Sequence, residues 1–223
     1  MQRTVVALAI TIVVLASYGC KKSGNKTPGI SETYQPVSSG SEWNYTTTGS
    51  NAGSFKITAT SSDTLINARS YRILTNSGGA NMYYCKSGSD YYRYGRFAEL
   101  NNEPLELLYL KDIAVGQSWT ETKIVSATVS GMGTVPVTAK FTFTVAEKGT
   151  AHIVGSTTFN EVIKITAIPS FNVSGSPIPV ASSTFEYYYA KNIGLIHSIT
   201  ALNIPLASIN SSSVTVLGSY SIK

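Results

Sequence analysis

Four short segments of the chain recur, in the same order, in its second half. The clearest pair contains the only two tryptophans, because Gly40-Ser41-Glu42-Trp43 is repeated as Gly116-Gln117-Ser118-Trp119. The other pairs are Phe55–Thr58 with Phe141–Thr144, Tyr71–Ile73 with Val162–Ile165, and Met82–Lys86 with Tyr187–Lys191. One such pair could arise by chance, but several in one order indicate an internal duplication. We therefore expect two similar halves, at about residues 36–109 and 111–223, with Trp43 and Trp119 as structural anchors of the repeat.

Apolar and polar residues alternate within the repeated segments, which is the pattern of half-buried β-strands. Phe55, Ile57 and Ala59 share one predicted face, and the same alternation recurs at 141–145. The strand-like segments Met82–Lys86 and Tyr91–Tyr94 flank the turn residues 87–90, so we predict a hairpin there. Prolines are expected where strands begin or end; these are Pro169, Pro177, Pro179 and Pro205.

These patterns predict an all-β fold in one domain, residues 36–223. Strands that pair in sequence order form meanders, and two duplicated meanders would make one large curved antiparallel sheet, an open or half-closed barrel. A β-sandwich is the alternative that the same patterns allow.

The first nineteen residues have the features of a lipoprotein signal peptide. Arg3 precedes an uncharged run at residues 4–16 that is too short to span a bilayer. The segment Leu15-Ala16-Ser17-Tyr18-Gly19-Cys20 resembles the lipobox cut by lipoprotein signal peptidase, which implies lipidation of Cys20. Residues 20–35 are rich in Ser, Gly, Lys and Thr, so we expect a flexible tether behind the anchor.

A lipidated Cys20 would tie the protein to a membrane of the cell envelope, because several acyl chains together give stable anchoring. Lys21 stands where an aspartate would signal inner-membrane retention in some bacteria, so we expect an outer-membrane lipoprotein, facing the periplasm or the cell surface. The remaining cysteine, Cys85, has no intramolecular disulfide partner. The net charge of +5 is modest and lacks a dense basic stripe, so nucleic acid is not an expected partner.

Few residues suggest catalysis or metal binding. His152 and His197 are the only histidines, and alternation places His197 on the same face as Leu195 and Ile199, as a packing residue. No serine lies in a Gly-x-Ser-x-Gly elbow, and no phosphate loop or metal-ligand spacing occurs. We therefore expect no cofactor, no metal and no enzymatic activity. Two carboxylates among Glu42, Glu121 and Glu186 would be the minimum for a glycan-active hydrolase.

Aromatic residues are the best candidates for binding. Tyr84, Tyr92 and Tyr94, with Arg93 among them, could form a surface that contacts a glycan or an envelope protein, since tyrosine supplies apolar area and a polar tip. The competing interpretation is that about half of these tyrosines pack in the core.

Three segments resemble a group of envelope lipoproteins called TapB-like. They are Tyr34–Pro36 with Gly40–Tyr45, Val115–Trp119, and Tyr188–Ile196. The resemblance implies a fold similar to the open barrels of lipoprotein carriers and supplies no catalytic residue. The leading hypothesis is a non-catalytic envelope binding or assembly module. A carrier of a lipid or other apolar ligand is the alternative, and a glycan-active hydrolase is the third.

Overall fold

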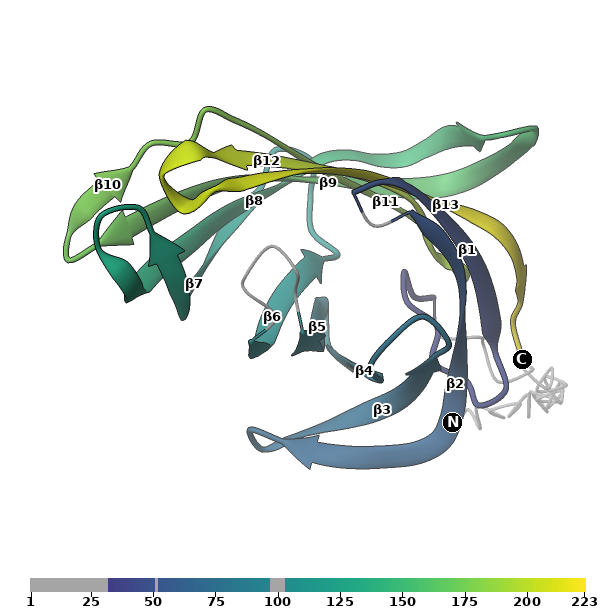
Figure 1. The fold of residues 1–223 in the computed structure, drawn as a ribbon. Coiled ribbons are helices and arrows are strands. Elements are labelled where there is room, and N and C mark those ends of the chain that lie inside the picture. Colours follow the sequence, from purple (N-terminus) through teal and green to yellow (C-terminus); the bar gives the residue numbers. More distant parts are fainter. Residues whose placement is uncertain (1–31, 51, 97–102) are drawn as a thin grey trace, which may run out of the picture. The chain divides into compact units, whose positions relative to one another are not determined.

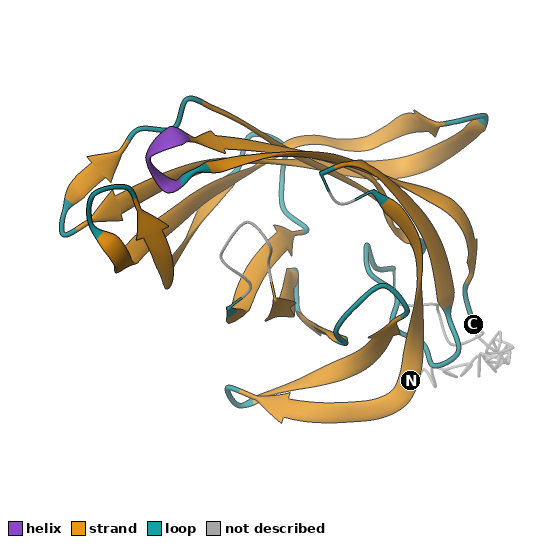
Figure 2. Cartoon of the chain, viewed as in Figure 1, coloured by secondary structure: helices purple, strands orange, loops and turns teal. Residues whose placement is uncertain are grey.

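The computed structural model describes residues 32–50, 52–96 and 103–223, all within one compact unit, Glu32–Lys223. The predicted signal peptide, Cys20 and most of the predicted tether lie outside the described residues. The described chain consists of β-strands with one short 3-10 turn, η2 (Pro205–Ala207), and contains no α-helix (Figure 2). The strands form a single antiparallel sheet that curls until it is nearly closed into a barrel (Figure 1). The predicted fold class is confirmed.

The strands of the first half are β1 (Glu42–Gly49), β2 (Gly53–Ile66), β3 (Arg69–Asn76), β4 (Met82–Ser87), β5 (Asp90–Arg96) and β6 (Pro104–Lys111). Those of the second half are β7 (Ser118–Val129), β8 (Gly133–Val154), β9 (Thr157–Val173), β10 (Ser176–Ile178), β11 (Ser182–Ala190), β12 (Gly194–Ile204) and β13 (Ile209–Ser221). The order across the sheet is β6-β5-β4-β3-β2-β1-β13-β12-β11-β9-β8-β7, and β10 pairs with β9 at the side. Each half is thus a meander, and the predicted hairpin is present as β4 and β5.

The repeated segments have the same pairing register in both halves. The corresponding pairs are Trp43–Ile57 with Trp119–Phe143, and Arg72–Tyr84 with Ile163–Tyr189. In both halves, equivalent residues pair between the first and second strands, and equivalent residues pair between the third and fourth strands. The sequence similarity therefore corresponds to equivalent positions in two similar meanders.

The two meanders meet differently at their two junctions. At one junction β1 and β13 form an antiparallel ladder from Glu42 to Gly49, with one register shift between Asn44 and Tyr45. At the other, β6 and β7 are the ends of the sheet and are joined by side chains. Trp119 Nε1 donates a hydrogen bond of 2.9 Å to the carbonyl oxygen of Leu108, and the Ser126 amide donates one of 2.9 Å to Glu103 Oε1. The two meanders are therefore joined by a ladder at one junction and bridged by side-chain hydrogen bonds at the other, where the sheet stays open.

The packed domain begins earlier than the sequence predicted. We expected a flexible tether through residue 35, but the Tyr34 side chain is only 3% exposed. The backbone amide of Tyr34 donates to Tyr91 Oη (3.1 Å), and the amide of Asn192 donates to the carbonyl oxygen of Thr33 (2.6 Å). The polar composition of the segment hid this because a single aromatic residue is enough to attach it to the core.

Pro169 also departs from expectation, because it lies inside β9 rather than at a strand end. Its only ladder partner is Phe141 of β8. On the other side of β9, β11 pairs only with residues 162–166 and β10 with residues 171–173. Pro169 therefore occupies a gap between two neighbours, where a missing amide proton breaks no ladder.

Candidate ligand cavity

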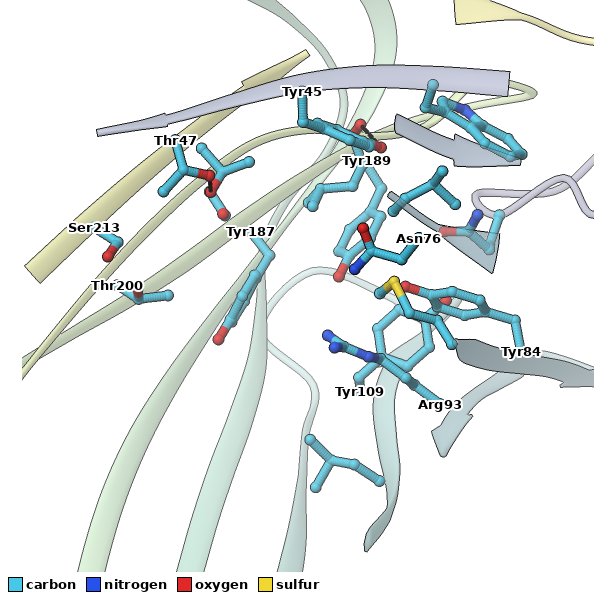
Figure 3. A pocket seen from close by; sticks show the side chains of 18 of the residues that line it. Tyr45, Thr47, Asn76, Tyr84, Arg93, Tyr109, Tyr187, Tyr189, Thr200 and Ser213 are labelled. Atoms are coloured by element: carbon cyan, nitrogen blue, oxygen red, sulfur yellow. Dashed lines mark hydrogen bonds between the residues drawn. The ribbon is translucent and has the colours of Figure 1, made fainter. Parts of the chain in front are cut away.

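A cavity of about 410 Å³ lies inside the curved sheet (Figure 3). Strands of both meanders line it, and the lining side chains are aromatic, aliphatic, hydroxyl or amide groups together with the guanidinium of Arg93. The described lining residues include no histidine, cysteine, aspartate, glutamate or lysine. Pockets of several hundred Å³ with mostly apolar walls and a few polar groups are the usual form of small-molecule sites.

Aromatic rings form much of the apolar wall. Phe141 contacts Phe143 and Phe185 with centroid distances of 6.2 and 6.3 Å. Trp43 and Ile57 line the same cavity from the first half. These are the inward positions of alternating strands, so the alternation that predicted the strands also determines the wall.

A polar group of side chains interrupts this wall, and we call Tyr84, Arg93, Tyr109 and Tyr189 the tyrosine–arginine cluster. Tyr84 and Arg93 are ladder partners on β4 and β5 and project to the same side of the sheet. The centroid of the Tyr109 ring lies 5.7 Å from the ring centroids of both Tyr84 and Tyr189. Figure 3 shows Tyr84 and Arg93 entering from the first half and Tyr189 from β11 of the second.

Strand alternation places Tyr109 in the cavity. Leu107 pairs with Arg93, and both line the cavity, so Tyr109, two residues after Leu107, lies on the same inner face. Tyr91 pairs with Leu110 and Tyr92 pairs with Leu108, so Tyr109 is also the extra residue of a β-bulge and has no ladder partner on β5.

The phenols of the cluster stay protonated at ordinary pH. Burial is the main cause that raises the pKa of Tyr84, Tyr109 and Tyr189, and the positive charge of Arg93 opposes the rise at each of them. Each can therefore act as a hydrogen-bond donor. The hydroxyl of Tyr109 is buried without a hydrogen-bond partner in the described part of the chain, and the whole residue is 7% exposed.

Tyr45, Thr47 and Thr215 also line the cavity, and their hydroxyl groups have hydrogen-bond partners within the protein. Tyr45 Oη donates a hydrogen bond of 2.9 Å to the carbonyl oxygen of Leu195. Thr47 and Thr215 share a hydrogen bond of 2.8 Å across the β1–β13 ladder. The Tyr109 hydroxyl differs from these groups because it lies at the same surface but has no protein partner among the described residues.

The structure does not combine the predicted binding residues into one surface. Tyr84 and Arg93 line the cavity, whereas Tyr92 and Tyr94 occupy alternate positions on β5 and project to the other face. Arg69 lies 4.0 Å over the Tyr92 ring, and Tyr94 contacts Tyr83 edge to face at 5.9 Å. Strand alternation separates neighbours in sequence, so a single aromatic surface made of all four residues is incorrect.

The two tryptophans occupy structural positions. Trp43 is 1% exposed and donates a hydrogen bond of 2.6 Å to the carbonyl oxygen of Ile193. Trp119 is 9% exposed and makes the junction bond to Leu108. Each tryptophan thus connects the first strand of its half to a segment that is not its ladder neighbour.

The two histidines meet outside the cavity lining. His152 Nε2 and His197 Nδ1 are 3.0 Å apart, and the Tyr188 ring stacks on His152 at 3.9 Å. The prediction that His197 shares a face with Leu195 is wrong because a bulge leaves Ile196 unpaired, so Leu195 turns to the cavity. No group of three or more histidine, cysteine or acidic side chains able to hold a metal ion occurs among the residues that the structure describes.

The candidate carboxylates are each engaged in an ion pair. Glu42 pairs with Lys56 at 3.1 Å, Glu121 with Lys123 at 3.0 Å and Glu186 with Lys164 at 3.2 Å. None of these three glutamates belongs to the cavity lining. Within the described ranges, no helix is long and apolar enough to cross a membrane.

Comparisons with known proteins show a related fold and no established family. No family model matches the chain, and no curated protein matches it. One solved structure is similar over 84% of this chain and 98% of its own, with a TM-score of 0.51 and 10% sequence identity. That structure is a Parabacteroides distasonis protein described as a "putative lipoprotein". At this identity the similarity concerns the fold of the two chains, which is therefore shared with a described lipoprotein.

Proposed function

We propose that this protein is an outer-membrane lipoprotein of the TapB-like kind, anchored through Cys20, whose β domain binds an amphipathic small molecule inside the barrel without transforming it. The proposal keeps the non-catalytic binding role expected from the sequence. It moves the binding site from an exposed aromatic surface to the interior, as in the carrier hypothesis.

The cavity is the observation that carries this proposal. Its volume of about 410 Å³ lies within the range of small-molecule sites, and its lining combines phenyl and aliphatic groups with a localised polar cluster. An amphipathic molecule matches that division because its apolar part can contact Phe141 and Phe185 while its polar end reaches the tyrosines. A purely polar solute would leave the aromatic wall in contact with water, which is unfavourable.

The chemistry of the lining favours binding over catalysis. General acid–base catalysis uses side chains that exchange protons near neutral pH, chiefly histidine and carboxylates. The described lining has none of these groups, and its tyrosines hold their protons because burial raises their pKa. The groups present can orient a ligand by hydrogen bonds.

The proposed anchor rests on the lipobox-like segment ending at Cys20, and the structural neighbour is itself described as a lipoprotein. A domain held beside a membrane would exchange amphipathic molecules with it over a short distance. The residues that follow Cys20 are rich in Ser, Gly and Lys, a composition that would give a tether reach.

The test fills the cavity and measures ligand uptake. Residues 32–223 are a suitable sample because this compact unit contains its own cores and ladders. Ala167 lines the cavity and is 6% exposed, whereas its neighbour Ile168 is 70% exposed. We expect Ala167→Phe to abolish binding of a fluorescent fatty-acid probe, and Ile168→Phe to leave it unchanged.

Native mass spectrometry of the same sample, purified without detergent, should show bound small amphipathic molecules that Ala167→Phe lacks. Thr200→Phe blocks the cavity from β12 and serves if the first variant is poorly folded by circular dichroism. Equal probe binding by wild-type protein and both folded cavity variants would contradict an interior site.

A further inference from the structure

The Tyr109 hydroxyl is a buried polar group of the cavity wall. It has no hydrogen-bond partner in the described chain, and its ring contacts the Tyr84 and Tyr189 rings. Leaving a buried hydroxyl unbonded is costly, and such groups often mark a position where a ligand supplies the missing partner. A structural role alone would be served equally well by phenylalanine.

The neighbours of Tyr109 can all donate hydrogen bonds. Tyr84 and Tyr189 are protonated phenols within ring contact of Tyr109, and Arg93 carries a guanidinium with up to five N–H donors. Hydrogen-bond donors thus converge on one part of the wall from both halves of the sheet. They lie on β4, β5 and β6 of the first half and on β11 of the second. A group that accepts several hydrogen bonds at once would satisfy this arrangement.

Charge further narrows the class of ligand. Arg93 brings a positive charge to the cavity wall, and no acidic side chain is among the described lining residues. Its charge already acts on the phenols, since it opposes the rise in the pKa of Tyr84, Tyr109 and Tyr189. An ammonium group placed here would meet both like charge and hydrogen-bond donors, whereas a carboxylate accepts hydrogen bonds at both oxygens.

Building on the proposed interior site, we propose that the tyrosine–arginine cluster recognises the carboxylate of a fatty acid. The acyl chain extends from the cluster along the apolar wall formed by Phe141, Phe143 and Phe185. Tyr109 donates to one carboxylate oxygen, and the guanidinium of Arg93 supplies the opposite charge.

The test compares three molecules with the same chain and different ends: decanoate, decanol and decylamine. Each displaces a fluorescent fatty-acid probe from residues 32–223 at pH 7.5. We expect decanoate to bind at least about tenfold more tightly than decanol, and decylamine to bind most weakly, because hydrogen bonds to a charged group are worth about 1.5–3 kcal/mol. Equal affinities for all three, or a preference for decanol, would overturn the carboxylate site and leave the interior site standing. Failure of the probe and all three molecules to bind would overturn both proposals.

Variants of the tyrosine–arginine cluster test where the carboxylate of the ligand binds. Tyr109→Phe should weaken decanoate about tenfold or more and change decanol by less than about threefold. Tyr45→Phe is the matched control, since Tyr45 also lines the cavity but its hydroxyl is committed to Leu195. Arg93→Met should remove most of the preference for decanoate over decanol, and Arg93→Lys should restore part of it. If Tyr109→Phe and Tyr45→Phe weaken decanoate equally, the cluster does not bind the carboxylate.

Discussion

Removing the Tyr109 hydroxyl should stabilise the empty protein, the reverse of what deleting a buried polar group usually does. Tyr109→Phe keeps the ring, which is 7% exposed and contacts Tyr84 and Tyr189, and deletes one oxygen that has no described partner. A buried hydroxyl without a hydrogen bond costs about 1–3 kcal/mol relative to water. We therefore expect the free energy of unfolding to rise by about 1 kcal/mol or more.

Tyr45→Phe provides the comparison within the same cavity. Its hydroxyl donates to the Leu195 carbonyl oxygen at 2.9 Å, so deletion removes a partly buried hydrogen bond. The expected loss is about 1–2 kcal/mol. The two variants make the same chemical change, tyrosine to phenylalanine, and differ only in whether the hydroxyl has a partner.

Urea denaturation of residues 32–223, stripped of bound ligand, measures both effects. The midpoint should move up for Tyr109→Phe and down for Tyr45→Phe, with an unchanged slope because the surface exposed on unfolding is the same. In a thermal melt a domain of this size shifts by about 2–4 °C per kcal/mol. A loss of stability for Tyr109→Phe as large as that for Tyr45→Phe would refute the assignment of an unsatisfied hydroxyl.

Three further outcomes follow from the fold and the sequence. Trp119→Phe removes the bond to the Leu108 carbonyl and should cost about 1 kcal/mol, with faster hydrogen exchange confined mainly to β6; unchanged exchange there would show that the junction does not depend on it. Burial lowers the pKa of both His152 and His197. The unfolded chain therefore binds protons at these histidines more readily than the folded chain, and the free energy of unfolding should fall as the pH drops below about 6.5. Urea midpoints at pH 7.5 and 5.5 measure this loss, which a His152→Gln/His197→Gln variant should reduce. Cys20→Ser in the full-length chain should release the protein from the membrane fraction and abolish acyl modification by mass spectrometry; retention of the variant would contradict the lipid anchor.

Local patterns predicted the architecture well where short-range chemistry decides it. The alternation at Phe55–Ala59 identified inward-facing positions, and the turn residues between β4 and β5 identified a hairpin, because both depend on neighbouring residues alone. The repeated tryptophan segments predicted two meanders, and the shared register gives that similarity a structural basis. The order of strands across the sheet follows from the tendency of sequential strands to pair.

The candidate site could be predicted only in part because bulges shift the pattern. At Leu195 a bulge with the extra residue Ile196 shifts the alternation, so Leu195 faces the cavity and His197 does not. Tyr109 follows Leu107 at regular strand spacing but is itself the extra residue of a bulge. No residue type at these positions marks a bulge in the sequence. Tyr84 and Arg93, the binding candidates chosen from the sequence, line the cavity, but the sequence assigned them to an exposed surface, since alternation does not reveal which face of a curved sheet encloses a cavity.

The ladder between β1 and β13 has a consequence for how the protein reaches its native state. β1 lies at the centre of the sheet, yet its partner on one side is the last strand of the chain. During synthesis β1 emerges early, and one of its edges stays unpaired until residues 209–221 have emerged. Contacts between such distant segments slow folding, and an unpaired strand can associate with other chains meanwhile. The middle of the finished sheet is thus the last part to become continuous, and a chain truncated before β13 would present β1 as an open edge.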